Sequence, residues 1–547
     1  MSMAWIVLVP PLIVIFLAAL TKRILFSLFV GIMSASLIIT DGNIPAAASY
    51  ILGRFWQTLQ LERLISIEGF YSCSNLFLLA FLSLIGVLIT IIRHSGAAYA
   101  YGKFVMNKIK TMRGAERASL SLSSLFFIDD YFASITVGSV MQPITDQFNI
   151  PRVKLALLVS AMAAPMAILM PMSTWVAELM GLLRNSGVGL GNAGSIIKSD
   201  QFSLYVMSVP FMMYAIIVAL TIWYIVSARV SYGLVARHET YARKTGELFG
   251  GKIPVARRIT DASEAHKRSS TLFDFLLPIV LLVASTMFLV LWTGSWWLLG
   301  GEYDFLTTLQ HARMPFSFCC GGLTAVVGTV TYYMHRNRLA ARALPGLLHE
   351  GFGLMSSSLV MLVFIWVLSG IVRDDLRTGA YLANLLVGQV KASFFPLMFF
   401  ALAALISSLI GTAWGTVGIL VPLALEMVPS FLGLQLPIDI TQAPMITALI
   451  GAILSGSVVG NHVSPVSDVS VMSATSVGAY HLDVVRAQIQ LALPTVIASL
   501  FAFYLVGLTL DEYGRMASAT LGIIGGFLLN VMMLHALQWL DKRRKKR

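Results

Sequence analysis

The sequence predicts an all-α polytopic membrane protein built from two inverted repeats. Of its 547 residues, 57% are hydrophobic and only 12% are charged. The mean hydropathy of +0.81 exceeds that of soluble proteins. Nine apolar runs approach the length of about 20 residues that a helix needs to cross a bilayer. They fall at residues 5–21, 24–40, 73–92, 203–228, 272–293, 314–334, 351–372, 484–510 and 515–537.

The distribution of Lys and Arg predicts the orientation, because basic loops are retained in the cytoplasm. The basic segments are Lys22 and Arg23, Arg93–Arg117, 229–271, and Arg336–Arg342. The segments expected outside are 41–72, 182–202, 294–313 and 373–392. We therefore expect an inner (cytoplasmic) membrane protein whose N-terminus lies outside and whose C-terminus is cytoplasmic. The net charge of +12 reflects this topology and contact of the basic tail with membrane lipid, and predicts no nucleic-acid partner.

Two long apolar stretches are interrupted by Gly, Pro, hydroxyl and carboxyl residues, and the predicted orientation requires an odd number of crossings through each. A re-entrant hairpin plus a broken helix satisfies this requirement. Each repeat then contains three helices, a hairpin, a broken helix and one more helix, and such inverted repeats are typical of secondary transporters. The expected parts are a first repeat at 1–228 (hairpin about 118–148, broken helix about 153–181), a cytoplasmic linker at 229–271, a second repeat at 272–510 (hairpin about 393–432, broken helix about 443–480), and an extra transmembrane helix with a basic cytoplasmic tail at 511–547.

The tip of the first hairpin carries two adjacent carboxylates, Asp129 and Asp130, inside an apolar run. Burying them requires a cation, a proton or hydrogen-bonding partners. A structural alternative is that the pair caps the half-helix that follows. The first broken helix offers Ser173 and Thr174 after Pro171, whose hydroxyls and freed carbonyls suit a small hard cation such as sodium. Here the alternative is an ordinary proline kink.

The second repeat has matching features. Its hairpin tip, Gly411–Gly418, combines three glycines with Thr412, Trp414 and Thr416 and exposes backbone to a substrate, although a close helix-packing face is the alternative. Its broken helix concentrates polar groups around Pro465. These groups are Asn461, His462, Ser464, Ser467 and Asp468. An isolated His in an apolar helix is more often a core residue, but these neighbours favour a site.

At these residues the sequence resembles the NhaC-type sodium/proton antiporter family of the ion transporter superfamily. The matching stretches are Phe127–Val140, Ala164–Trp175, Gly411–Pro422 and Leu454–Ser476. The resemblance implies that Asp129, Asp130, Ser173, Thr174, Trp414, Thr416, His462, Ser464 and Asp468 line the ion and substrate site. This chain departs from the family pattern at Asn461, where members usually have Asp, and so lacks one carboxylate.

The expected function is alternating-access transport, most simply sodium/proton antiport. Asp130 and Asp468 are the expected sodium ligands or proton carriers, and His462 with Thr412, Trp414 and Thr416 is expected to contact the substrate. The alternatives are a sodium- or proton-coupled transporter of a small organic anion or amino acid and, less favoured, a channel.

No catalytic residue is expected, because the sequence contains no HExxH, nucleophile-elbow or P-loop signature. Sodium or a proton is the only expected ligand besides the small ion or small-molecule substrate. The three cysteines predict neither a disulfide framework nor a metal site. A homodimer is compatible with the sequence.

Overall fold

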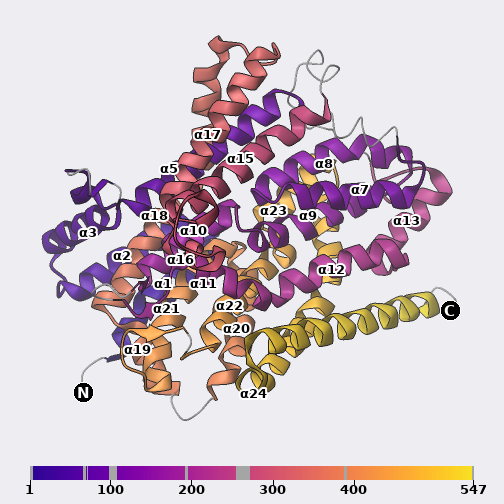
Figure 1. Cartoon of the computed structure of the whole chain (residues 1–547). Helices are drawn as coiled ribbons and strands as arrows, with labels where there is room; N and C mark the ends of the chain where they lie inside the picture. Colours follow the sequence, from indigo (N-terminus) through magenta and orange to yellow (C-terminus); the bar gives the residue numbers. More distant parts are fainter. Residues whose placement is uncertain are drawn as a thin grey trace.

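The computed structural model describes residues 4–65, 69–70, 72–97, 108–190, 195–253, 271–386, 391–440 and 442–544. Nearly all of these residues are helical, which confirms the predicted all-α class (Figure 1). Among them, ten helices are long and apolar enough to cross a membrane, or eleven if one bent pair forms a single span. Part of the predicted linker, 254–270, and the tail residues 545–547 lie outside the described residues.

The order of elements in the first part of the chain recurs in the second. Each part has a helix pair, a longer helix, a broken helical hairpin, a broken helix and a final helix. The first set is α1 (Val9–Thr21), α2 (Ile24–Ile39), α5 (Ser74–His94), α7 (Met112–Leu125), α8 (Asp130–Gln147), α9 (Arg152–Leu169), α10 (Thr174–Asn185), α11 (Gln201–Ser208) and α12 (Met213–Ala228). The second is α15 (Leu272–Thr293), α17 (Met314–His335), α18 (Leu344–Gly370), α20 (Phe395–Ile410), α21 (Ala413–Leu432), α22 (Met445–Val463), α23 (Asp468–Val477) and α24 (His481–Arg544).

Several short helices lie in segments for which the sequence predicts only loops or a linker. They are α3 (Ile44–Thr58), α13 (Gly233–Thr245), α16 (Phe305–His311) and α19 (Thr378–Leu386). Helix α3 begins where the Asn43 side chain accepts a hydrogen bond from the Ala46 amide at 3.1 Å, and it is bent by 119° from α2. A polar cap therefore starts a helix within a segment that hydropathy alone assigns to a loop.

One predicted span is divided in the structure, and two consecutive spans adjoin at a glycine. The run 203–228 is divided by a 3-10 turn, Val209–Phe211, which contains Pro210. The runs 484–510 and 515–537 form two helices within α24, which separate at Gly514 and pack against each other, since the Asn530 side chain donates to the Thr495 hydroxyl at 3.2 Å. Gly514 has a φ of 74°, a left-handed conformation that glycine adopts readily. The second of these helices runs to the C-terminus at the lower right of Figure 1.

A small parallel sheet joins loops of the two parts of the chain. Strand β2 (Ile197–Lys198) pairs with both β1 (Val188–Gly189) and β3 (Ile438–Asp439). The first two strands follow α10, and the third follows α21. The sheet thus ties the far ends of two half-helices that begin at the chain breaks described below.

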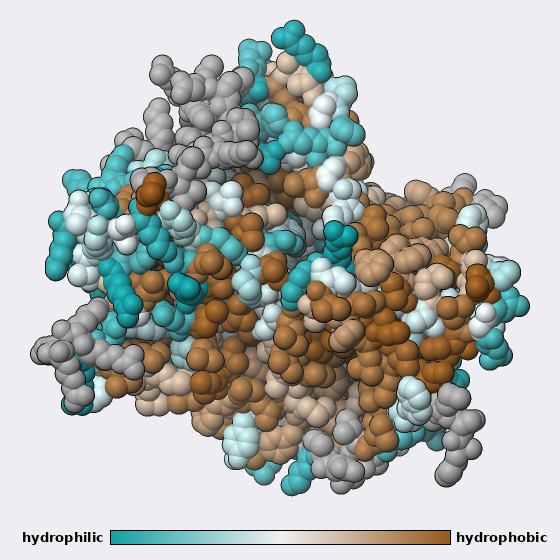
Figure 2. Space-filling model, turned by 180° about the vertical axis from the view of Figure 1, so that it is seen from behind, coloured by the Kyte–Doolittle hydropathy of each residue, from teal (hydrophilic) through white to brown (hydrophobic). Residues whose placement is uncertain are grey.

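The outer surface is largely apolar, as expected for a protein in contact with lipid. Figure 2 shows brown apolar side chains over most of one face, with teal polar groups gathered toward its edges. Large apolar side chains such as Phe16, Leu405 and Leu528 are more than half exposed, at 66%, 59% and 55%. In water such exposure would favour aggregation, whereas in a bilayer it provides the contact with lipid.

Helices α20 and α22 pack closely because small residues face each other. The Ser407 hydroxyl donates to the Gly456 carbonyl at 3.0 Å and accepts from the Gly460 amide at 3.1 Å. A Cβ atom added at Gly460 would lie 2.4 Å from the Ser407 carbonyl oxygen. Membrane helices gain stability from such close backbone contact, since lipid provides no hydrophobic force between them.

We predict that Gly460→Ala destabilises the protein by about 1–3 kcal/mol, because the added methyl group forces α20 and α22 apart. Thermal unfolding of the purified chain in detergent measures this change. Gly353→Ala in α18 is the matched control, since a Cβ atom there meets nothing within 4 Å. Equal melting temperatures for the two variants would contradict the packing account.

Candidate functional site

Four half-helices, α8, α10, α21 and α23, begin at breaks in the chain, and their amino ends meet in the interior. The Thr174 amide at the start of α10 donates to the Ile128 carbonyl just before α8, at 2.8 Å. The rings of Trp175 in α10 and Trp414 in α21 are 4.5 Å apart. The two breaks of the second part also touch, since a Cβ atom at Gly411 would lie 3.0 Å from the Ser464 hydroxyl.

Asp129 holds two of these helix starts together. Its backbone is extended, with a φ of −154°, and its Oδ1 accepts from the Phe132 amide at 2.9 Å, so it caps α8. Its Oδ2 accepts from the Thr174 hydroxyl at 3.1 Å. The capping role considered from the sequence is thus confirmed for Asp129. The side chain nevertheless remains close to open space, because it lines a cavity.

Asp130 and Glu178 add two further acidic groups beside Asp129. Asp130 is 4% exposed and lies against the Trp175 indole. Glu178, one turn into α10, is also 4% exposed, and its Oε2 has no hydrogen-bonding partner within the described chain. The charges of Asp129 and Asp130 act on it through space. Such a cluster is costly to bury when fully ionised, so it favours bound protons or a cation.

In the described ranges no group of three or more His, Cys, Asp or Glu side chains is placed to hold a metal ion. Hydroxyl and carbonyl oxygens are ligands that sodium shares with other hard cations. Ser173, which accepts from the Val176 amide at 3.4 Å, and Thr174 supply such oxygens at the start of α10.

Two adjoining cavities meet at Tyr131 and Asp468. The first, of about 270 Å³, is lined by Asp129 on α8, by Ser357 and Ser358 on α18, and by Arg93 at the end of α5. The second, of about 130 Å³, shares Tyr131, Asp468 and both serines and adds Lys22, Gly411 and Thr412. We call them together the central cavity. Asp468 is exposed to it, whereas Asp129 is 3% exposed.

The central cavity extends to helix ends that carry basic residues. Arg93 at the end of α5 forms an ion pair with Glu350. Lys22, in the turn between α1 and α2, donates to the Leu409 carbonyl at the end of α20. Both belong to segments that the sequence places in the cytoplasm. The lining of the central cavity around Asp468 therefore includes α5, α18 and the α1–α2 turn.

Other residues selected from the sequence have structural partners. His462 is 2% exposed, accepts or donates at 2.7 Å with the Tyr214 hydroxyl of α12, and does not line the central cavity. The Asn461 carbonyl accepts from the hydroxyls of Ser467 and Ser470 at 3.0 and 2.8 Å, which stabilises the break before α23. The Thr416 hydroxyl donates to the Thr412 carbonyl at 3.3 Å within α21. The Ser464 hydroxyl has no partner among the described residues.

The structure adds residues that sequence reasoning did not select. Tyr131 follows the Asp pair directly, and its side chain lies beside the Asp468 carboxylate. Ser357 and Ser358 belong to a run of three serines in the apolar segment 351–372, which is the one sequence signal that marks α18 as cavity-lining. The sequence used Lys22 only to predict the membrane orientation, because nothing in its local sequence indicates that the α1–α2 turn contacts α20.

Broken membrane helices whose starts gather carboxylates and hydroxyls around a cavity define a secondary transporter. The family model described as "Na+/H+ antiporter family" matches residues 166–508, which is more than half of the chain. The chain belongs to this family, and the resemblance found in the sequence is confirmed. Its substrate is accordingly an ion or a small molecule.

Two curated relatives are similar in sequence. An uncharacterized protein of Haemophilus influenzae is 29% identical over 526 residues, which cover 96% of this chain and 94% of that protein. The malate-2H(+)/Na(+)-lactate antiporter of Bacillus subtilis is 29% identical over 146 residues, which cover 27% of each chain.

Two solved transporters are distant structural neighbours. The YdaH transporter of Alcanivorax borkumensis aligns with a TM-score of 0.43 at 15% identity, covering 92% of this chain and 89% of that one. MtrF of Neisseria gonorrhoeae, from a class of antimetabolite efflux pumps, aligns with a TM-score of 0.40 at 12% identity, covering 90% and 85%.

We predict that cysteines placed in the central cavity react with a hydrophilic thiol reagent. In a chain with Cys73, Cys319 and Cys320 replaced by Ser, Ser358→Cys reacts because its side chain lines the cavity. Ser160→Cys in α9 is the control, since Ser160 is fully buried. Labelling followed by mass spectrometry measures both, and equal protection of the two cysteines would contradict the cavity.

Proposed function

We propose that this chain exchanges sodium for protons across the membrane by alternating access. The observation that carries the proposal is that Asp129 and Asp468, each at the start of a half-helix from a different part of the chain, line one water-accessible cavity. Membership of the antiporter family supports sodium and protons as the coupled ions. Asp130, Ser173, Thr174, Ser464 and Ser467 complete the proposed ion site, in which Asp130 and Asp468 hold sodium.

Competition for one carboxylate couples the two ions. An ionised carboxylate attracts sodium, whereas a protonated one has lost the charge that binds it. Each ion therefore displaces the other, and the empty, fully ionised cluster of Asp129, Asp130 and Glu178 is disfavoured by burial and mutual repulsion. This penalty keeps the site occupied while it moves, which is what exchange requires.

The proposed movement involves the inverted repeats at 1–228 and 272–510. The central cavity reaches Arg93 and Lys22, which we infer to be cytoplasmic, so this conformation faces inward. On the opposite side the Trp175–Trp414 contact packs α10 against α21. Opening outward would separate these indoles and close α8 and α23 onto α5 and α18.

A second candidate is sodium- or proton-coupled transport of a small organic anion. The Thr412 side chain makes no capping hydrogen bond at the start of α21, and Thr412 lines the same cavity as Lys22. Free amide groups and the positive end of the helix, with a nearby ammonium, suit a carboxylate. The similarity to a malate and lactate antiporter supports this candidate. Thr412, Trp414, Thr416 and His462 remain the proposed substrate contacts.

We predict that Asp468→Asn weakens the apparent affinity for sodium by roughly 10-fold to 100-fold, since a charged hydrogen-bonding partner contributes about 1.5–3 kcal/mol. Asp130→Asn abolishes pH-dependent sodium flux. Proteoliposomes containing the purified protein, loaded with a pH-sensitive dye and given an imposed sodium gradient, measure both. The exposed Asp511→Asn in α24 is the control. Wild-type flux in Asp130→Asn and Asp468→Asn would exclude these carboxylates from the mechanism.

The same liposomes distinguish the two candidates. Sodium/proton antiport needs no organic solute, so a sodium gradient alone changes the internal pH. If the pH changes only when malate, lactate or an amino acid is present on one side, the organic-anion function is correct and simple antiport is not.

A further inference from the structure

A second cavity, of about 260 Å³, lies away from the central cavity, between α7, α9, α13 and the end of α24. Five basic side chains and two acidic ones line it. The basic ones are Arg113, Lys154, Arg229, Arg243 and Lys542, and the acidic ones are Glu116 and Glu239. We call it the basic cavity. All of its charged residues except Lys154 belong to segments that the sequence analysis places in or next to the cytoplasm.

Lys154 neutralises much of the acidic charge. Its Nζ lies 2.6 Å from Glu116 Oε1 on α7 and also pairs with Glu239 on α13, and all three side chains are at least nine-tenths buried. The structure gives Arg229, Arg243 and Lys542 no ion-pair partner within its described ranges, and the Arg113 Nε has no hydrogen-bonding partner there. The cavity therefore carries an excess of positive charge that favours binding of an anion.

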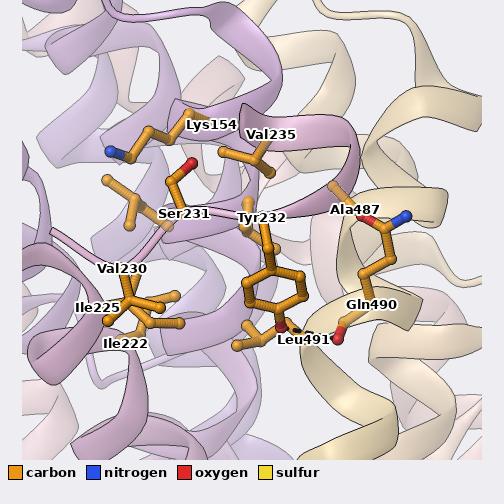
Figure 3. A pocket seen from close by; sticks show the side chains of 12 residues that line it. Lys154, Ile222, Ile225, Val230, Ser231, Tyr232, Val235, Ala487, Gln490 and Leu491 are labelled. Carbon is orange, nitrogen blue, oxygen red and sulfur yellow. Dashed lines mark hydrogen bonds between the residues drawn. The ribbon is translucent and has the colours of Figure 1, made fainter. Parts of the chain in front are cut away.

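An apolar recess adjoins the basic cavity and shares Lys154, Val230 and Ser231 with it. Figure 3 shows Ile222 and Ile225 of α12 on one side of this recess and Leu491 of α24 on the other, while the Lys154 ammonium points away from them. The Ser231 hydroxyl, at the junction, has no hydrogen-bonding partner among the described residues. The recess is small, about 30 Å³, so a ligand with a negatively charged head in the basic cavity places only the first part of an apolar group there.

We propose that the basic cavity and its apolar recess bind one anionic phospholipid of the cytoplasmic leaflet. Arg229, Arg243 and Arg113 hold the phosphate, and the acyl chains extend past α12 and α24 into the surrounding bilayer. Basic pockets between membrane helices on this side of a bilayer recognise anionic headgroups, and anionic lipids are concentrated in that leaflet. This site is independent of which cargo the central cavity carries.

The lipid would also join parts that move differently in transport. Helices α7 and α9 lead directly into α8 and α10, which start at the central cavity, whereas α13 and the end of α24 do not contribute to it. A phosphate between Arg113 on α7 and Arg243 on α13 therefore bridges the two groups of helices. We expect bound lipid to change the transport rate without changing the affinity for the ion.

The test compares two double variants of equal charge change. Arg229→Gln/Arg243→Gln removes two basic residues from the cavity, and both side chains are exposed, so the fold tolerates the change. Arg237→Gln/Arg342→Gln removes two exposed arginines that do not line it. Native mass spectrometry counts phosphatidylglycerol retained by the full-length protein, with phosphatidylcholine of the same chain length as reference.

We expect the cavity variant to bind phosphatidylglycerol roughly 30-fold more weakly, since each basic residue near an anionic surface contributes about fivefold. The control variant keeps wild-type binding, and Arg229→Lys/Arg243→Lys restores most of it. Equal retention by the two glutamine variants, or equal affinity for phosphatidylcholine, overturns the proposal. If inorganic phosphate stabilises the wild type but not the cavity variant while lipid binding is unchanged, the occupant is a free anion and the lipid proposal is wrong.

Discussion

The structure depends on hydrogen-bonding partners within the membrane for the backbone groups at the helix breaks and for the carboxylates beside them. Where α8 and α10 begin, amide groups have no helical partner, and each such group left unpaired in lipid costs several kcal/mol. Asp129 provides a partner at both helix starts, because one of its carboxylate oxygens caps α8 and the other accepts a hydrogen bond from the Thr174 hydroxyl. The Ile128 carbonyl accepts the Thr174 amide. The interior position of these breaks, away from lipid, follows from this requirement.

Small residues at the helix contacts allow the backbones to approach closely enough for the breaks to meet. The contacts of Ser407 with Gly456 and Gly460 bring α20 and α22 together, so that the break after α20 meets the break after α22. At Gly138 a Cβ atom would lie 2.0 Å from the Ser476 hydroxyl, and that hydroxyl donates to the Ser134 carbonyl at 2.8 Å. These contacts bring α8 against α23 and place Tyr131 beside Asp468. The site is therefore a consequence of backbone approach that larger side chains would prevent.

Charge is distributed over two separate sites with opposite character. The central cavity contains carboxylates at helix starts and suits cations, although Lys22 and the start of α21 offer an anion a place beside them. The basic cavity contains arginines at the membrane boundary and suits an anion. Lys154 on α9 lines the basic cavity, with its charge balanced by Glu116 and Glu239. This balance lets a lysine occupy a membrane helix, which would otherwise be unfavourable.

Hydropathy and the positions of polar residues were sufficient to predict a polytopic helical protein, whereas the division into two inverted repeats, each with a hairpin and a broken helix, stays a prediction. The reason is physical, since a span has a fixed length and a carboxylate inside it is rare. The same reasoning missed α3, α13, α16 and α19, because short helices carry little periodic signal. It also missed Ser357, Ser358 and Lys22, because their role depends on a neighbour far away in the chain.

By itself, then, the sequence determined the membrane environment, the helical class and the positions of polar residues within the apolar runs. All of these are local properties of composition and residue order. Only the tertiary structure decided which breaks face each other, that Asp129 caps a helix while Asp468 faces open space, and that His462 binds Tyr214. Those outcomes depend on distances between segments hundreds of residues apart, which helix packing sets and no local pattern encodes.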